Sequence, residues 1–121
     1  MLKVIHLSEG SVYHLPGRDW YYMIGPSNSD ARNLTFGLAE FPPDSKAQPH
    51  THDAQEEIIY ILSGQGKFIT TDGVYDLNPG IAVYIPPQLE HRICVVGEEP
   101  LRLVTLFSPP VVPGAYDPNK S

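Results

Sequence analysis

The sequence predicts an all-β fold, a sandwich or barrel built from many short strands. Short apolar runs rich in β-branched and aromatic residues recur along the chain, and polar turn segments separate them. The 121 residues include 13 prolines and 10 glycines, which fall mainly between the apolar runs. No segment shows a convincing helical period, so strands and turns account for the pattern.

The first half of the chain predicts four strands. Residues 3–7 and 20–24 are short and largely apolar or aromatic, and the polar residues 27–33 predict a loop. Residues 34–41 predict a longer strand, which the following Pro-Pro-Asp ends. Residues 48–52, with histidines at alternate positions, predict the next strand.

Turn signals divide the second half into short segments. They occur at residues 63–66, 71–73, 78–80 and 86–88, and each contains glycine or proline. Residues 81–85 are apolar throughout, so we expect them to be buried. The tail from Pro109 holds four prolines and is expected to be extended or partly disordered. The predicted strands of this half are residues 57–62, 67–71, 74–77, 81–85, 91–96 and 101–107.

Composition indicates one domain over residues 1–121, with enough apolar residues for a single core. The net charge is −6 and no basic cluster occurs, which argues against nucleic-acid and anionic-membrane partners. The central apolar run of residues 58–62 is too short to span a bilayer. The first ten residues do not resemble a signal peptide, and a single cysteine, Cys94, excludes an internal disulfide, so we expect a cytoplasmic protein.

Three histidines and a glutamate predict a mononuclear metal site. His50 and His52 alternate around Thr51, so on a strand both imidazoles lie on one face. Glu57 follows after four residues, and His91 begins a predicted strand after a proline-rich turn. Imidazole nitrogens with one carboxylate suit a divalent transition metal such as Fe, Mn, Ni, Zn or Cu. Separate surface or core histidines are the alternative, which the coincidence of spacing and turn residues disfavours.

These spacings resemble the two motifs of the cupin superfamily. The first motif reads G-x5-H-x-H-x3 or 4-E-x6-G, and the second reads G-x5-P-x-G-x2-H-x3-N. The resemblance places the family's metal ligands on His50, His52, Glu57 and His91. The turn positions of the motifs that match are Gly64, Gly80 and Pro86, and the positions that depart are Asp44, Gln88 and Val95.

The resemblance implies a double-stranded β-helix, or jelly-roll cupin barrel, with the metal inside. We expect the barrel core at about residues 34–108, N-terminal strands within residues 1–25 and a tail at 109–121. None of the three departures is a ligand, so they concern turn geometry and family subgroup rather than metal binding.

Strand alternation predicts which side chains share the site. Glu56 also satisfies the first half of its motif, but only Glu57 leaves six residues before Gly64, and we favour it. If Glu57 points inward, Tyr60 points elsewhere; if His91 points inward, Cys94 faces outward and is a poor candidate nucleophile. The apolar residues expected to share the inward face are Ile59, Ile61, Ile93 and Val95.

Few other side chains are candidates for chemistry. Glu56, Gln48 and Tyr60 are candidate proton-handling or orienting groups beside the metal. Arg18, Arg92 and Arg102 are candidates to bind an acidic substrate, although exposed arginines are commonly solvated charges.

Four protein ligands on an octahedral ion leave two positions open, which is typical of a catalytic site. The resemblance therefore implies a metal-dependent enzyme acting on a small oxygenated metabolite. Sugar or uronate isomerisation or ring opening is one class, and residues 106–109 loosely resemble small pectin-degradation cupins. Dioxygenation is the other class. The alternative is a non-catalytic module that binds or senses a small ligand.

We also expect a homodimer, because small cupins commonly pair and exposed sheet edges need cover. The N-terminal strands, including residues 20–24, are candidates to provide that cover by joining the sheet of a partner.

Overall fold

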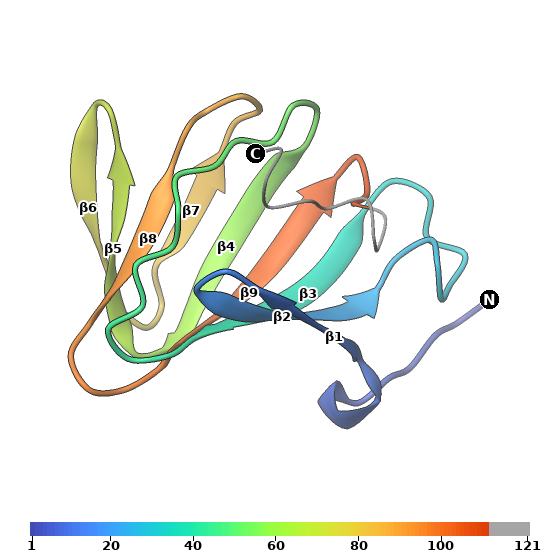
Figure 1. Ribbon diagram of the computed structural model, residues 1–121. Helices are drawn as coiled ribbons and strands as arrows, with labels where there is room; N and C mark the ends of the chain where they lie inside the picture. The colour runs from blue at the N-terminus through green and yellow to red at the C-terminus, as the bar shows by residue number, and fades with distance from the viewer. Residues whose placement is uncertain (112–121) are drawn as a thin grey trace.

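The computed structural model describes residues 1–111, and their regular structure is almost entirely β (Figure 1). One short 3-10 helix, η1 (Leu7–Glu9), precedes the strands. In chain order the strands are β1 (Ser11–Leu15), β2 (Arg18–Ile24), β3 (Thr35–Phe41), β4 (Glu56–Ser63), β5 (Gln65–Thr70), β6 (Gly73–Leu77), β7 (Ala82–Ile85), β8 (Arg92–Val96) and β9 (Leu101–Ser108).

The strands form two antiparallel sheets, as expected for a jelly-roll. The larger sheet has the order β1-β2-β3-β9-β4-β7, and the smaller has the order β6-β5-β8. Figure 1 shows the smaller sheet at the left and the larger one extending to the right. β4 pairs with β9 and β5 pairs with β8, so segments far apart in the sequence lie side by side. Two antiparallel sheets paired in this way confirm the predicted fold class.

Strict alternation of side chains along β4 separates the core from the outer face. Ile59 and Ile61 are 1% and 0% exposed, whereas Ile58 and Tyr60 are each 45% exposed. Full burial of one such side chain contributes roughly 1.5–3 kcal/mol. The alternation fixes the register of β4, because a shift by one residue would expose both isoleucines. It also confirms that Glu57 lies on the inward face, at 6% exposure.

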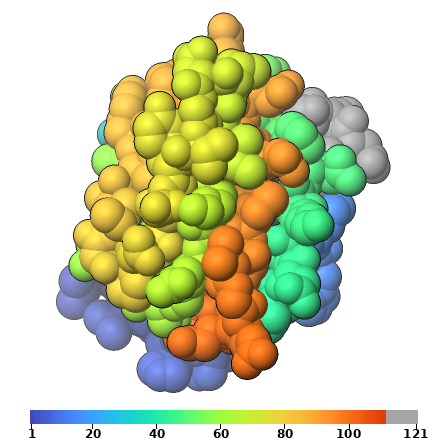
Figure 2. Space-filling model, turned by 90° about the vertical axis from the view of Figure 1, so that its left-hand side faces the viewer, coloured from blue at the N-terminus to red at the C-terminus, as the bar shows by residue number. Residues whose placement is uncertain are grey.

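The segment after β3 runs beside β8 and closes one side of the small sheet (Figure 2). Lys46 pairs with Cys94, and the amide of Val95 donates to the carbonyl of Ser45 at 3.0 Å. The strand expected at residues 48–52 is wrong: this segment makes one isolated bridge instead. Pro49 is the second residue of this segment and has no N–H to contribute to a ladder.

The N-terminal expectation is wrong in part. Residues 3–7 form no strand; His6 caps η1, its ring nitrogen accepting from the amide of Ser8 while its own amide donates to Glu9. No strand was predicted at β1, which forms a hairpin with β2 through Pro16 and Gly17. The expected strand at residues 20–24 is confirmed within β2.

The expectation that residues 81–85 are buried throughout is also wrong. β7 is the last strand of the larger sheet, so one of its edges has no neighbour in that sheet. Ile85 is buried, whereas Ile81 and Tyr84 are 40% and 56% exposed. Within β7 the exposed Ala82 and Tyr84 alternate with the half-buried Val83 and the buried Ile85, as on a strand with one face in water.

The first tail residues pack onto the core. The hydroxyl of Thr35 donates to the carbonyl of Val111 at 3.1 Å and accepts from its amide at 3.0 Å. Val111 is 7% exposed. Val111 is therefore held against the core, and the rest of the tail that was expected to be extended or partly disordered, residues 112–121, lies outside the described residues.

Two glycines with the same backbone conformation allow a test of the packing at the start of the small sheet. Gly64 and Gly97 have φ of 83° and 89°. A Cβ at Gly64 would lie 2.2 Å from the carbonyl oxygen of Pro100, whereas nothing lies within 4 Å of one at Gly97. We expect Gly97→Ala to cost about 1 kcal/mol for its backbone conformation, and Gly64→Ala to cost about 1–3 kcal/mol more. Urea unfolding of both variants measures the difference, and equal losses would contradict the packing described.

Candidate metal centre

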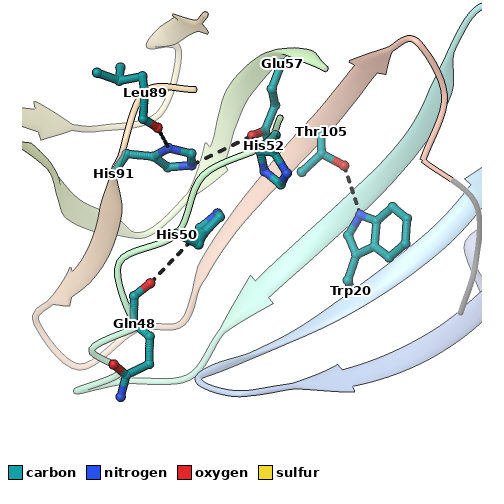
Figure 3. Close-up of polar contacts among 8 residues, drawn as sticks. All are labelled: Trp20, Gln48, His50, His52, Glu57, Leu89, His91 and Thr105. Atoms are coloured by element: carbon teal, nitrogen blue, oxygen red, sulfur yellow. Dashed lines mark hydrogen bonds and ion pairs between the residues drawn. The ribbon is translucent and has the colours of Figure 1, made fainter. Parts of the chain in front are cut away.

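Three histidines from two distant segments meet inside the barrel (Figure 3). A two-hydrogen-bond bridge joins the backbones of His50 and His91: the His50 amide donates at 2.9 Å and the His91 amide at 3.0 Å. The amide of Gln88 donates to the carbonyl of His52 at 2.8 Å. Backbone contacts, rather than a continuous strand, thus place the H-x-H segment beside His91.

The imidazoles are close enough to share one ion. One ring nitrogen from each of His50, His52 and His91 lies within 4.8 Å of the others. Oε1 of Glu57 lies 3.4 Å from Nε2 of His52 and 4.0 Å from Nε2 of His91. All four predicted ligands therefore lie close together inside the barrel, and Figure 3 shows their side chains converging.

Backbone carbonyls orient two of the rings. Nδ1 of His91 lies 2.9 Å from the carbonyl oxygen of Leu89, and Nδ1 of His50 lies 3.3 Å from that of Gln48. A carbonyl can only accept, so Nδ1 carries the proton in both contacts and Nε2 keeps its lone pair. This arrangement of a ring N–H donating to a carbonyl is the usual support of a metal-binding histidine.

The surroundings of His50 and His91 favour the neutral form of these two rings. Burial, followed by the nearby His91 and Arg18, lowers the pKa of His50 from its ordinary value to about 3. Burial also lowers the pKa of His91, although its hydrogen bond to Leu89 and the charge of Glu57 partly oppose the shift. Neutral imidazole is the form that binds metal, so the site favours the ligand form at ordinary pH.

The carboxylate of Glu57 supplies a test of whether a metal fits. Its Oε1 is buried and makes no hydrogen bond within the part of the chain that the structure describes. The 3.4 Å contact with His52 is an ion-pair distance without hydrogen-bond geometry. A buried carboxylate oxygen without a donor is costly, and a cation bound beside it would remove that cost. The donor set and this oxygen together fit a divalent transition metal.

Apolar and aromatic side chains complete a small cavity of about 40 Å³ around these groups. The ring of Phe68 stacks on His91 at 5.3 Å, and the ring of Phe107 meets His52 edge-on at 5.2 Å. Ile59 and Val111 line other parts of the wall. The volume holds a few waters or the reacting end of a small molecule, and the apolar walls strengthen electrostatic interactions inside.

One hydroxyl in the wall was missed by the sequence analysis. Thr105 is buried and accepts a hydrogen bond from the indole Nε1 of Trp20 at 3.0 Å (Figure 3). An indole N–H can only donate, so the hydroxyl proton of Thr105 remains available to a second partner. Its inward position on β9 follows from strand alternation, but nothing in its sequence neighbourhood marked it as polar lining.

The three weaker candidates do not reach the cavity. Glu56 and Tyr60 lie on the exposed face of β4, and Glu56 accepts a 2.7 Å hydrogen bond from the hydroxyl of Tyr84. Gln48 is exposed, and Figure 3 shows its amide pointing away from the imidazoles. Their locations give no support to the expected proton-handling or orienting roles.

The three candidate arginines and Cys94 differ in where they lie relative to the cavity. Arg18 lines the cavity, whereas Arg102 pairs with Glu40 at 3.2 Å and Arg92 contacts the sulfur of Cys94. Arg92 and Cys94 lie on the half-exposed positions of β8, as the alternation predicted. Of the three arginines considered as candidates to bind an acidic substrate, only Arg18 therefore lies beside the histidines.

Two of the departures from the cupin motifs preserve the backbone that glycine would provide. Asp44 and Gln88 stand where the motifs have glycine, and their φ angles are 64° and 67°. Non-glycine residues reach this left-handed region only at a cost, which the hydrogen bond from Gln88 to His52 helps to offset. The turns that lead into the ligand segments thus keep their geometry despite the substitutions.

Comparison with known proteins identifies the class of protein. Residues 37–107 match the model of the cupin domain, more than half of the chain. The chain therefore belongs to the cupin family. Its fold resembles that of ectoine synthase from P. lautus, with a TM-score of 0.81 and 16% identity over 92% of this chain and 80% of that one.

Curated relatives include enzymes. The chain is 36% identical to the dimethylsulfoniopropionate lyase DddW of Ruegeria pomeroyi over 74% of its own length and 57% of the relative. It is 39% identical to the L-ectoine synthase of Bordetella avium over 68% of its own length and 62% of the relative. The chain thus spans less than two thirds of either protein. Among the described residues, no helix is long and apolar enough to cross a membrane.

Exchange of the two neighbouring glutamates tests which carboxylate belongs to the site. Glu57→Gln keeps the side-chain shape but removes the charge beside His52, and we expect it to weaken Co(II) binding about tenfold or more. Glu56→Gln removes the same charge on the outer face, where the partner is Tyr84, and should leave binding unchanged. Competition titration with a chromophoric chelator measures both. Equal affinities in the two variants would remove Glu57 from the ligand set.

Proposed function

We propose that this cupin is a metal-dependent enzyme acting on a small oxygenated metabolite at a mononuclear site of His50, His52, Glu57 and His91. The observation that carries the proposal is the meeting of three imidazoles with a buried carboxylate oxygen that makes no hydrogen bond among the described residues, in an apolar cavity. One divalent transition metal per chain would satisfy all four groups, and Fe, Mn, Ni, Zn and Cu all accept such donors.

The chain's own residues suit a cavity for chemistry rather than a closed structural site. A bound metal would supply a Lewis acid that polarises a ligand oxygen. The apolar walls formed by residues such as Ile59 and Phe107 exclude bulk water from that oxygen. The hydroxyl of Thr105 can donate a hydrogen bond into the same space. These groups bind and orient a small ligand whose oxygen atoms reach the ion.

Lyase, isomerase or ring-opening chemistry is the first reaction class that we propose. Two relatives support this class, because one is named a lyase and the other a synthase, and neither name denotes an oxygenase. Dioxygenation at the same four ligands is the second class, since ligand set alone does not determine the reaction. The bound metal discriminates them: iron or copper supports oxygen chemistry, and zinc, nickel or manganese supports the first class.

Removal of one imidazole tests the proposed site directly. We expect His52→Ala to lose Co(II) binding while its far-ultraviolet circular dichroism stays that of the wild type, because the barrel rests on its sheets. Thr51→Ala, one residue away and outside the ligand set, should bind one Co(II) per chain. Visible absorption during Co(II) titration reports both. Full binding by folded His52→Ala would overturn the ligand assignment.

We also propose a homodimer, formed through the outer face of the larger sheet. The expectation that residues 20–24 join a partner's sheet is wrong, because β2 lies between β1 and β3 and both its edges are occupied. The outer face instead presents an apolar row across four strands. Register pairing aligns its members Phe36, Leu106, Ile58 and Tyr84. An exposed row of this kind is typical of a surface that another protein covers.

A charge placed in the middle of this row tests the dimer. Light scattering should give the mass of two chains for the wild type and of one chain for Ile58→Lys, because a buried lysine without a partner disfavours association. Val74→Lys is the matched control, since Val74 is 60% exposed on the small sheet. A wild type that scatters as one chain at all concentrations would contradict the proposed assembly.

A further inference from the structure

A buried tryptophan reaches across one strand to hold a hydroxyl in the wall of the metal-binding cavity. Nε1 of Trp20 on β2 donates to Oγ1 of Thr105 on β9 at 3.0 Å, although β3 lies between these two strands (Figure 3). Trp20 is 6% exposed and Thr105 is 4% exposed. Both residues line the cavity that the three imidazoles and Glu57 also line. The hydrogen bond therefore fixes one polar atom of that wall.

The intervening strand has a glycine where the indole crosses it. Gly37 on β3 pairs with Tyr22 on one side and with Thr105 on the other. A Cβ at Gly37 would lie 2.7 Å from Nε1 of Trp20 and 3.1 Å from Oγ1 of Thr105. A side chain at this position would displace the indole from the hydroxyl. The contact thus depends on three residues from three neighbouring strands.

The indole leaves the proton of the hydroxyl unused. An indole N–H can only donate, so it takes an acceptor position of Oγ1 and the hydroxyl proton points elsewhere. Among the residues that the structure describes, Thr105 donates to no acceptor. Buried hydroxyls commonly complete their hydrogen bonds. This donor therefore suits an acceptor atom that enters the cavity.

Strand register places this hydroxyl one inward position away from Glu57. Phe107 on β9 pairs with Glu57 on β4, and Thr105 pairs with Ile59. Glu57 and Thr105 are thus diagonal neighbours on one face of two adjacent strands, and such residues commonly lie roughly 7–8 Å apart. A ligand bound to the ion through one atom can present a second atom, a few bonds away, to the hydroxyl.

We propose that Thr105 is a specificity-determining residue that donates a hydrogen bond to the ligand, and that Trp20 is a positioning residue acting through it. The inference rests on the proposed function, because another atom of the same ligand reaches the ion. The substrate class is a small metabolite with a carbonyl or carboxylate oxygen a few bonds from its metal-binding atom. Such an oxygen accepts the hydroxyl proton, whereas an apolar group of the same shape leaves that proton without an acceptor.

Two thiols of nearly the same shape test this preference on the Co(II)-loaded full chain. Mercaptoacetamide carries a carbonyl oxygen, and isobutanethiol has an apolar branch in its place. We expect Thr105→Val to weaken mercaptoacetamide binding about tenfold, because the carbonyl loses a buried donor, and to leave isobutanethiol binding unchanged. Thr105→Ser keeps the hydroxyl and should keep the preference. Anaerobic titration, followed by the sulfur-to-cobalt absorption band, gives each dissociation constant without an activity assay.

Trp20→Phe tests the positioning role separately. It keeps the hydroxyl of Thr105 but removes the N–H that orients it, so the preference for mercaptoacetamide over isobutanethiol should fall about threefold. Because the preference is a ratio, a change of cavity size that affects both thiols alike cancels. An unchanged preference would overturn the role of Trp20. The matched control is Thr71→Val, which removes a hydroxyl from the exposed turn between β5 and β6 and should change neither constant.

The outcomes separate this inference from the proposed function. Equal mercaptoacetamide affinity in wild type and Thr105→Val, each holding one Co(II), would overturn the inference and leave the proposed function intact. An equal loss for both thiols would mark a structural role of Thr105 and overturn it too. A wild type that holds no Co(II) would reject the proposed function and the inference with it. Should Thr105→Val not fold, the double variant Trp20→Phe/Thr105→Val leaves no indole N–H without an acceptor and gives the same comparison.

Discussion

The backbone bridge between His50 and His91 is the constraint on which the site depends. The two residues are far apart in sequence, and two reciprocal hydrogen bonds of 2.9 and 3.0 Å hold them side by side. The pairing places the neighbouring ligands as well. His52, the second histidine of the H-x-H segment, reaches Glu57 on β4, and the carbonyl of Leu89 orients the ring of His91. The two sheets provide a rigid frame, but this bridge joins the ligand segments.

The surroundings of the bridge explain why the centre is buried and yet suited to a metal ion. Aromatic rings cover the imidazoles on two sides, and burial keeps His50 and His91 in the neutral form that binds metal. The same burial leaves one oxygen of Glu57 without a hydrogen-bond donor among the described residues. A polar network of this kind is stable only when it is completed, and a cation is the group whose chemistry completes it.

Strand alternation made much of the fold and the inward faces predictable. The alternation of β4 and β8 determined that Glu57 points inward and that Tyr60 and Cys94 do not, because register fixes side-chain direction. The segment at residues 48–52 resisted prediction, since its histidine spacing resembles a strand although Pro49 removes a ladder donor. The exposure of Tyr84 and the burial of Val111 depend on sheet order and tail path, which local sequence does not encode. Arg18 was visible as a candidate, but only the hairpin's contact with Ser45 shows why it reaches the cavity.

We propose above that this cupin barrel holds one catalytic transition metal. Elemental mass spectrometry of untagged protein, purified without chelator, tests it most directly by giving both the identity and the stoichiometry of the ion. The account predicts close to one divalent transition metal per chain, retained through gel filtration. Protein that holds no metal as purified, and takes up none of iron, manganese, nickel, zinc or copper on reconstitution, would contradict it.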